Sequence, residues 1–190
     1  VYREMGLLAR SQEDAAKAES YFKEGQTDFE RALGVRGDQI GRAPTTEGDF
    51  ESYDIRVDFA EHLFRAERIS EANRMLADLE EALPLASKPE GLKPEYCRLR
   101  GKIERLRVEM AQKEGQKFEA LKHAICAYSY FTRFSELDRK RKGMSNKTQE
   151  LLLELAQEGR ADIYELLSDW VKTANPQPFP EVNQYVERLK

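Results

Sequence analysis

The chain has 190 residues, which is enough for one sizeable hydrophobic core or a short stack of helix pairs and too few for two full enzyme domains. Hydrophobic residues make up 40% and charged residues 35%, with only 11 glycines and 7 prolines, a composition typical of long amphipathic helices and not of β-sandwiches or barrels. The net charge of −4 argues against nucleic-acid binding by the whole domain, which normally needs a basic surface for the phosphates.

Cysteine content and hydropathy predict the compartment. Cys97 and Cys126 are too few for a disulfide-rich secreted scaffold, and both stand in apolar helical patterns where a buried thiol is common. No run approaches the roughly 18 consecutive apolar residues of a membrane span, and the N-terminus lacks the apolar region of a signal peptide. We therefore predict a cytoplasmic protein that does not bind a membrane. Because the chain begins at Val1 and ends at Lys190 within an apolar-periodic stretch, we expect it to be a fragment of a larger protein.

The N-terminal segment, residues 1–33, is predicted to form a pair of helices. Apolar residues recur at helical spacing in its first ten residues and again from Ala15 onward, and Ser11, three residues before Asp14, is the expected start of the second helix. The following stretch, residues 34–52, contains four glycines and a proline with few apolar residues, so we expect a long loop there.

Two more helix pairs are predicted in the middle of the chain. Residues 53–84 carry a clear helical hairpin, in which Ser70 is the expected cap of the second helix and Pro84 its end. Residues 95–136 carry another pair, whose second helix has two apolar stripes and should therefore be packed on two sides.

The C-terminal part is predicted to hold a fourth pair, residues 147–173, and a capping helix, residues 180–190, that opens with Pro180 in its first turn. Trp170 is expected to be a core anchor of the fourth pair, because apolar residues surround it on the same helix. The sequence thus predicts an all-α domain over residues 1–190, with about nine helices and no strand.

The hairpin over residues 57–84 resembles a tetratricopeptide repeat. Small residues of this pattern let paired helices approach, and large residues fill the space between neighbouring pairs. The matching positions are Phe59, Ala60, Leu63, Ala72, Leu76 and Pro84. Residues 2–22 and 97–127 fit the same frame, although the frame recurs after about 54 and about 41 residues where the family uses 34, and the family's tryptophan is absent. The resemblance implies a short right-handed solenoid of antiparallel helix pairs, and a related helical bundle is the alternative.

In the family that the chain resembles, the first helix of each pair lines a concave face. The frame assigns ten residues to that face: Arg3, Leu7, Arg10, Val57, Glu61, Phe64, Arg65, Arg98, Lys102 and Arg105. They are mostly basic with apolar neighbours, and the guanidinium fork of arginine suits carboxylates, so the implied ligand is an acidic peptide or a peptide C-terminus. The alternative interpretation is that these residues form solvated helix faces paired with nearby glutamates.

Other candidate sites are weaker. Arg139 to Lys142 could contact nucleic acid, but four basic residues at a helix end also complement the helix dipole. His123 and Cys126 stand one turn apart, yet no second pair with metal-ligand spacing exists, so we expect no metal. The sequence has no Gly-Lys-Ser/Thr phosphate loop, no Gly-x-Ser-x-Gly and no His-Glu-x-x-His, and we predict neither enzymatic activity nor a cofactor.

Three functional hypotheses follow from the sequence. The first is a protein–protein interaction module that binds a partner peptide or protein segment, in a concave and locally basic groove. The second is the helical sensor or scaffold region of a larger signalling regulator, for example a signalling ATPase. The third, less favoured, is an RNA-associated helical repeat. The oligomeric state and the identity of the partner are not predicted.

Overall fold

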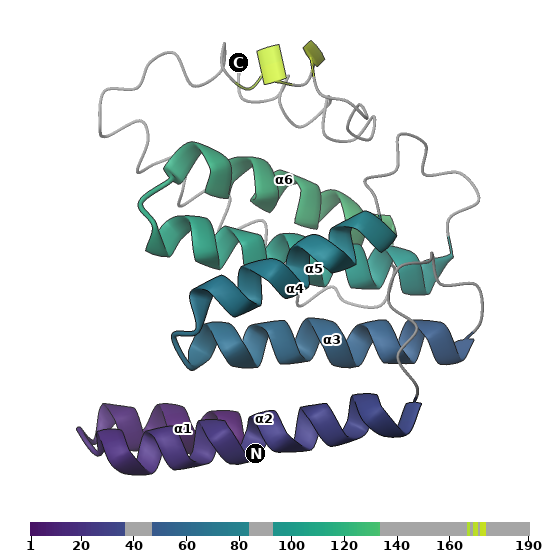
Figure 1. The fold of residues 1–190 in the computed structure, drawn as a ribbon. Coiled ribbons are helices and arrows are strands. Elements are labelled where there is room, and N and C mark those ends of the chain that lie inside the picture. The colour runs from purple at the N-terminus through teal and green to yellow at the C-terminus, as the bar shows by residue number, and fades with distance from the viewer. Residues whose placement is uncertain (37–46, 84–92, 134–166, 168, 171, 174–190) are drawn as a thin grey trace. The chain divides into compact units, whose positions relative to one another are not determined.

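A computed structural model of the chain describes residues 1–36, 47–83 and 93–133 and five positions between 167 and 173. Within residues 1–36, 47–83 and 93–133 the regular elements are six helices that follow one another as sequential antiparallel pairs (Figure 1). The predicted all-α class is therefore confirmed. The chain divides into two compact units, residues 1–83 and 84–190. The helices predicted over residues 147–190 lie almost entirely outside the described residues.

The first pair consists of α1 (Tyr2–Ser11) and α2 (Ala15–Arg36). Our assignment of Ser11 as the cap of the second helix is wrong. Ser11 is the last residue of α1, where its hydroxyl donates a hydrogen bond to the carbonyl oxygen of Leu8 (2.7 Å). Asp14 takes the capping role instead, because its Oδ1 accepts a hydrogen bond from the backbone N–H of Lys17 (3.0 Å).

The second pair consists of α3 (Glu47–Arg65) and α4 (Ile69–Ala82). The loop predicted over residues 34–52 is shorter than expected, because α2 continues through Arg36 and α3 already begins at Glu47. Phe50 and Tyr53 are 4% and 5% exposed, so burial of their rings explains why α3 extends toward its N-terminus. Residues 37–46 lie outside the described part of the chain.

The start of α4 also differs from the prediction. The helix begins at Ile69 with Arg68 in the N-cap position, and no side chain caps it, so our assignment of Ser70 as the cap is wrong. Glu67, in the turn before it, has a φ of 68°, a left-handed conformation that reverses the chain between the two helices. Pro84, the predicted end of this helix, lies outside the described residues.

Within the first unit, α3 packs against α2 and α4 and touches α1. Ala60 on α3 and Ala72 on α4 are both fully buried, and their small side chains let the two helices approach closely. Gly6 on α1 likewise allows a close approach of α1 to α2, because a Cβ there would lie 2.9 Å from Cζ of Phe22. The resulting core holds both helix pairs together in one unit.

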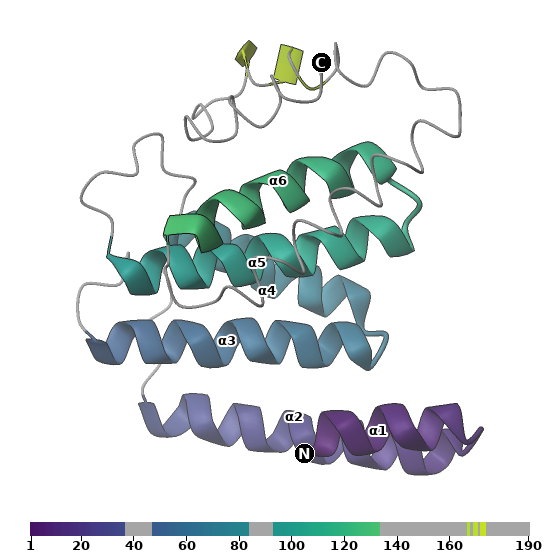
Figure 2. The same cartoon turned by 180° about the vertical axis from the view of Figure 1, so that it is seen from behind.

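The second unit contains α5 (Pro94–Lys113) and α6 (Lys117–Arg133), which lie side by side (Figure 2). Pro94 occupies the first turn of α5, where its missing N–H leaves no hydrogen bond unmade. Gly101 allows the closest approach of the two helices, because a Cβ there would lie 2.7 Å from the ring of Phe131.

The core of the second unit forms along the facing sides of α5 and α6. Both cysteines, Cys97 and Cys126, are buried and unbridged, as predicted. Trp170 packs against this core but is only partly buried, and the ammonium group of Lys122 lies 5.8 Å from its ring. Trp170 therefore flanks the core and does not sit at its centre. No helix in the described residues is both long and apolar enough to cross a membrane.

Two glycines on α2 provide a matched test of this packing. A Cβ at Gly25 would lie 2.5 Å from Cε1 of His62, whereas a Cβ at Gly34 would meet nothing within 4 Å. Overpacking costs about 1–3 kcal/mol and the better helix propensity of alanine offsets about 1 kcal/mol. We expect Gly25→Ala to lower the free energy of unfolding by up to about 2 kcal/mol and Gly34→Ala to raise it by up to about 0.5–1 kcal/mol. Urea unfolding followed by circular dichroism measures both, and equal effects would contradict the described contact between α2 and α3.

Candidate functional site

A cleft of about 270 Å³ opens in the first unit where α2 and α4 flank α3. Its floor is formed by buried side chains of α3, and its walls by side chains of α2 and α4, several of them exposed. The lining residues are Gln26, Glu30, Tyr53, Arg56, Phe59, Leu63, Glu71, Arg74, Met75, Asp78 and Leu79.

A second hollow, of about 390 Å³, adjoins the first, because Gln26 and Leu63 line both. Its other lining residues come from α2, from the end of α3 and from the turn before α4: Glu19, Phe22, Lys23, His62, Ala66 and Arg68. The two hollows together are called the α2–α4 cleft below.

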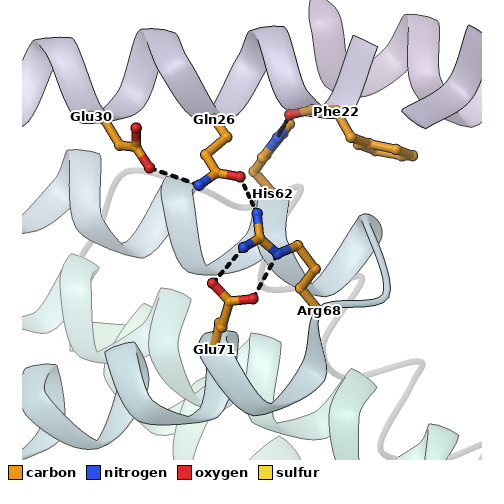
Figure 3. A network of polar contacts seen from close by, with 6 residues as sticks. All are labelled: Phe22, Gln26, Glu30, His62, Arg68 and Glu71. Atoms are coloured by element: carbon orange, nitrogen blue, oxygen red, sulfur yellow. Dashed lines mark hydrogen bonds and ion pairs between the residues drawn. The ribbon is translucent and has the colours of Figure 1, made fainter. Parts of the chain in front are cut away.

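A hydrogen-bonded network crosses this cleft (Figure 3). Arg68 forms a two-pronged ion pair with Glu71, with Nε to Oε1 at 2.6 Å and Nη2 to Oε2 at 2.7 Å. Its Nη1 donates to the side-chain carbonyl of Gln26 on α2, and the Gln26 amide donates in turn to Glu30 (2.7 Å). Arg68 therefore joins the start of α4 to the middle of α2.

His62, at the boundary of α2 and α3, is 1% exposed. Its Nε2 lies 2.7 Å from the carbonyl oxygen of Phe22. A carbonyl can only accept, so Nε2 carries the proton. Burial lowers the pKa of His62 below its ordinary value and outweighs the hydrogen bond to Phe22, which acts to raise it; the charges of Arg3 and Arg68 add smaller effects in the same direction as burial. The ring is therefore neutral at pH 7.

Four of the ten residues that the sequence assigned to a groove come together where α1 meets α3. Arg3 pairs with Glu61 at 3.0 Å, and Arg65 approaches the same carboxylate at 3.5 Å. Arg10 donates to the backbone carbonyl of Arg65 (2.8 Å), and its guanidinium lies 4.9 Å from the ring centroid of Phe22. These arginines thus have partners within the chain, as the alternative interpretation of solvated, paired helix faces expects.

The apolar members of the same set lie deeper. Leu7 is half-buried against the small core that α1 and α2 share, while Val57 and Phe64 are 3% and 7% exposed. A partner could reach Val57 or Phe64 only if helices moved apart.

The remaining three predicted residues, Arg98, Lys102 and Arg105, belong to α5 in the second unit. They recur at spacings of four and three, so they share one face of the helix, and all three are half-buried. The structure therefore places these three residues together on one face of α5.

Sequence reasoning missed a buried polar cluster in the second unit. Arg100 and Glu104, both 2% exposed, form an ion pair one turn apart on α5, and Nδ1 of His123 on α6 lies 2.7 Å from Oε2 of Glu104. Burial acts to raise the pKa of Glu104, but the charge of Arg100 and the hydrogen bond with His123 outweigh it and hold that pKa below its usual range. The sequence signal was an arginine and a glutamate four residues apart on an otherwise apolar face.

This cluster also bears on His123 and Cys126, the two residues considered above as possible metal ligands. His123 is engaged with Glu104, and burial raises the pKa of the Cys126 thiol well above its ordinary value, so the thiol stays protonated at neutral pH. Within the three described segments, no group of three His, Cys, Asp or Glu side chains is placed to hold a metal ion.

Comparison with known proteins does not assign the chain to a family. No protein-family model, no curated protein and no solved structure matches the chain. The similarity to tetratricopeptide repeats thus stays a resemblance in sequence pattern, and what the structure supports is an all-helical arrangement of sequential pairs.

The α2–α4 cleft was not predicted either. Its residues come from three helices, and only the close spacings of Arg68 with Glu71 and of Gln26 with Glu30 gave local signals of pairing. The contact of Gln26 with Arg68 and the role of His62 carried none, because they depend on which helices become neighbours.

The contacts of Arg68 with Glu71 and Gln26, called the clamp below, can be tested with two arginine variants. Arg68 holds Glu71 and Gln26, whereas Arg31 is exposed and has only a 3.4 Å contact with Asp28. We expect Arg68→Ala to lower the free energy of unfolding by about 1 kcal/mol, and Arg31→Ala to change it by less than about 0.5 kcal/mol. Urea unfolding compares the two. Equal effects would show that the clamp adds nothing to stability.

Proposed function

We propose that this chain is a protein–protein interaction module that binds a helical segment of a partner in the α2–α4 cleft. The observation that supports this most is the cleft's construction, with a floor of aromatic and aliphatic side chains of α3 beside the buried Arg56, and mostly polar walls from α2 and α4. Such a surface matches the helix-in-groove mode of recognition, in which an amphipathic helix inserts its apolar side chains. The proposal requires no catalytic step, metal or cofactor.

The apolar part of the cleft suits a few side chains. Phe59 and Leu63 belong to the floor, and Met75 and Leu79 line it from α4. Met75 is half-buried, and its flexible thioether can adapt to an incoming side chain. At about 270 Å³ this hollow has room for a few side chains of a partner.

The length of the cleft supports a helical occupant. Along α2, the lining residues run from Glu19 to Glu30, a rise of about 16 Å, or about three helical turns. The walls present both signs of charge: Glu30 and Asp78 face the first hollow together with Arg74, and all three are exposed. A partner helix with both acidic and basic residues beside its apolar stripe would complement them.

The predicted groove on α1 and α3 remains a second possible surface for the same function. It is favoured by the gathering of Arg3, Arg10 and Arg65 where the two helices meet, which would suit an acidic segment. Their internal partners weigh against it, since an acidic ligand would have to compete with Glu61. If the chain is part of a larger regulator, the cleft could instead hold another segment of that protein. The RNA hypothesis rests on the groove arginines and on Arg139 to Lys142, and the latter lie outside the described residues.

Three charge-reversal or polar variants separate these possibilities. Arg74→Glu combined with Met75→Gln alters the α2–α4 cleft, Arg65→Glu alters the face of α1 and α3, and Arg31→Glu on the exposed side of α2 is the control. We expect the cleft variant to bind a captured partner at least about tenfold more weakly, because a buried apolar contact and a charge are lost together. Binding is measured by quantitative pull-down and titration, after circular dichroism has shown equal helicity.

Each outcome has a distinct meaning. Loss of binding in the cleft variant alone supports the proposal. Loss in Arg65→Glu alone moves the binding surface to α1 and α3. Unchanged binding in all three variants contradicts an interaction site in the first unit.

A further inference from the structure

We propose that His62 makes the docking of α2 on α3 depend on pH, so that acidification opens the contact between the pair α1 and α2 and the pair α3 and α4. The inference does not depend on the proposed partner. It concerns a conformational response of the first unit alone.

His62 is a structural part of the contact. Its ring lies against α2, with its centroid 5.6 Å from that of Phe22 and 5.5 Å from that of Phe29. Gly25 provides the space for the ring, because a Cβ at that position would lie 2.5 Å from Cε1 of His62. The His62 ring is therefore part of the packing of α2 on α3, with the second hollow on its other side.

The hydrogen bonds of His62 fit only the neutral ring. Nε2 donates to the carbonyl of Phe22, and Nδ1 is buried without a hydrogen-bond partner in the described residues. Burial of a neutral Nδ1 without a partner costs much less than burial of a charge, whereas a protonated Nδ1 is a charged donor that needs an acceptor. Protonation would thus leave a buried positive charge half-satisfied, a cost that outward movement of the ring into water removes.

The surrounding charges add to that cost. Arg3 on α1, Arg68 before α4 and the N-terminal amino group all disfavour the protonated ring. The nearest opposite charges are already engaged, since Glu61 pairs with Arg3 and Glu71 with Arg68. On α2, the side chains of Glu19 and Lys23 line the hollow beside His62 and carry opposite signs. Among the described charged groups around His62, the negative ones are thus matched by positive ones.

The direction of the pH effect follows from the lowered pKa. Well above the ordinary value of about 6.5, His62 is neutral in both the docked and the opened state, and docking is unaffected. As the pH falls from there to the pKa of the docked state, the opened state takes up a proton that the docked state does not. The docking equilibrium then weakens by up to about tenfold for each pH unit, the limit for one proton.

The test uses amide hydrogen exchange on the complete chain at pH 7.5 and at pH 5.5, corrected for intrinsic exchange rates. The chain has only two histidines, so His62→Gln removes the proposed group and His123→Gln is the matched control. Glutamine does not titrate but can still donate a hydrogen bond to Phe22. We expect the protection of α2 amides to fall at low pH in wild type and in His123→Gln, and to stay constant in His62→Gln.

An equal fall in His62→Gln, or constant protection of α2 in wild type, would overturn the proposal. If His62→Gln does not fold, the imidazole of His62 is followed by its NMR chemical shifts in wild type. The proposal then requires the shift change of His62 and the loss of α2 protection to occur over the same pH range. If His62 titrates while the α2 amides remain protected from exchange, the proposal is overturned.

Discussion

The first unit depends on the close approach of α2 to α3 at Gly25 and His62. Without a side chain at Gly25, the imidazole of His62 reaches the backbone of α2 and donates its hydrogen bond to Phe22. This contact places the pair α1 and α2 on the pair α3 and α4, because α1 itself contributes few contacts to α3. Both hollows of the α2–α4 cleft have α2 as one wall, so the cleft exists only while this approach is maintained.

The ion pairs Arg68–Glu71 in the first unit and Arg100–Glu104 in the second differ in how deeply they are buried. In the first unit, Arg68 and Glu71 lie at the rim and remain partly exposed, so their charges are solvated and the clamp contributes modestly. In the second, Arg100 and Glu104 are fully buried, and such pairs cost several kcal/mol in desolvation per ion before they attract each other. The pair, completed by His123, constrains how α6 lies on α5.

Local periodicity was sufficient to predict the helical class and the first three helix pairs, because apolar residues at spacings of three and four report the buried face of each helix directly. Helix ends were predicted less well. Ser11 and Ser70 have capping chemistry, but Asp14 and the left-handed turn at Glu67 determined where the next helices start. The cleft could not be predicted, because the positions of Gln26, His62 and Arg68 acquire meaning only once α2, α3 and α4 are packed. The frame of the resemblance selected α1, α3 and α5 instead, and on the first two of these helices buried Val57 and internally paired Arg10 leave less surface for a partner.

The docking of α2 on α3 is tested most directly by the nuclear Overhauser effect between Hε1 of His62 and the α-protons of Gly25. The described packing places Cε1 of His62 against Gly25 and predicts a strong cross-peak at pH 7.5, together with an Nε2-protonated tautomer in the nitrogen shifts of the ring. An assigned His62 without that cross-peak, or with its proton on Nδ1, would contradict the docking of α2 on α3 and the cleft that depends on it.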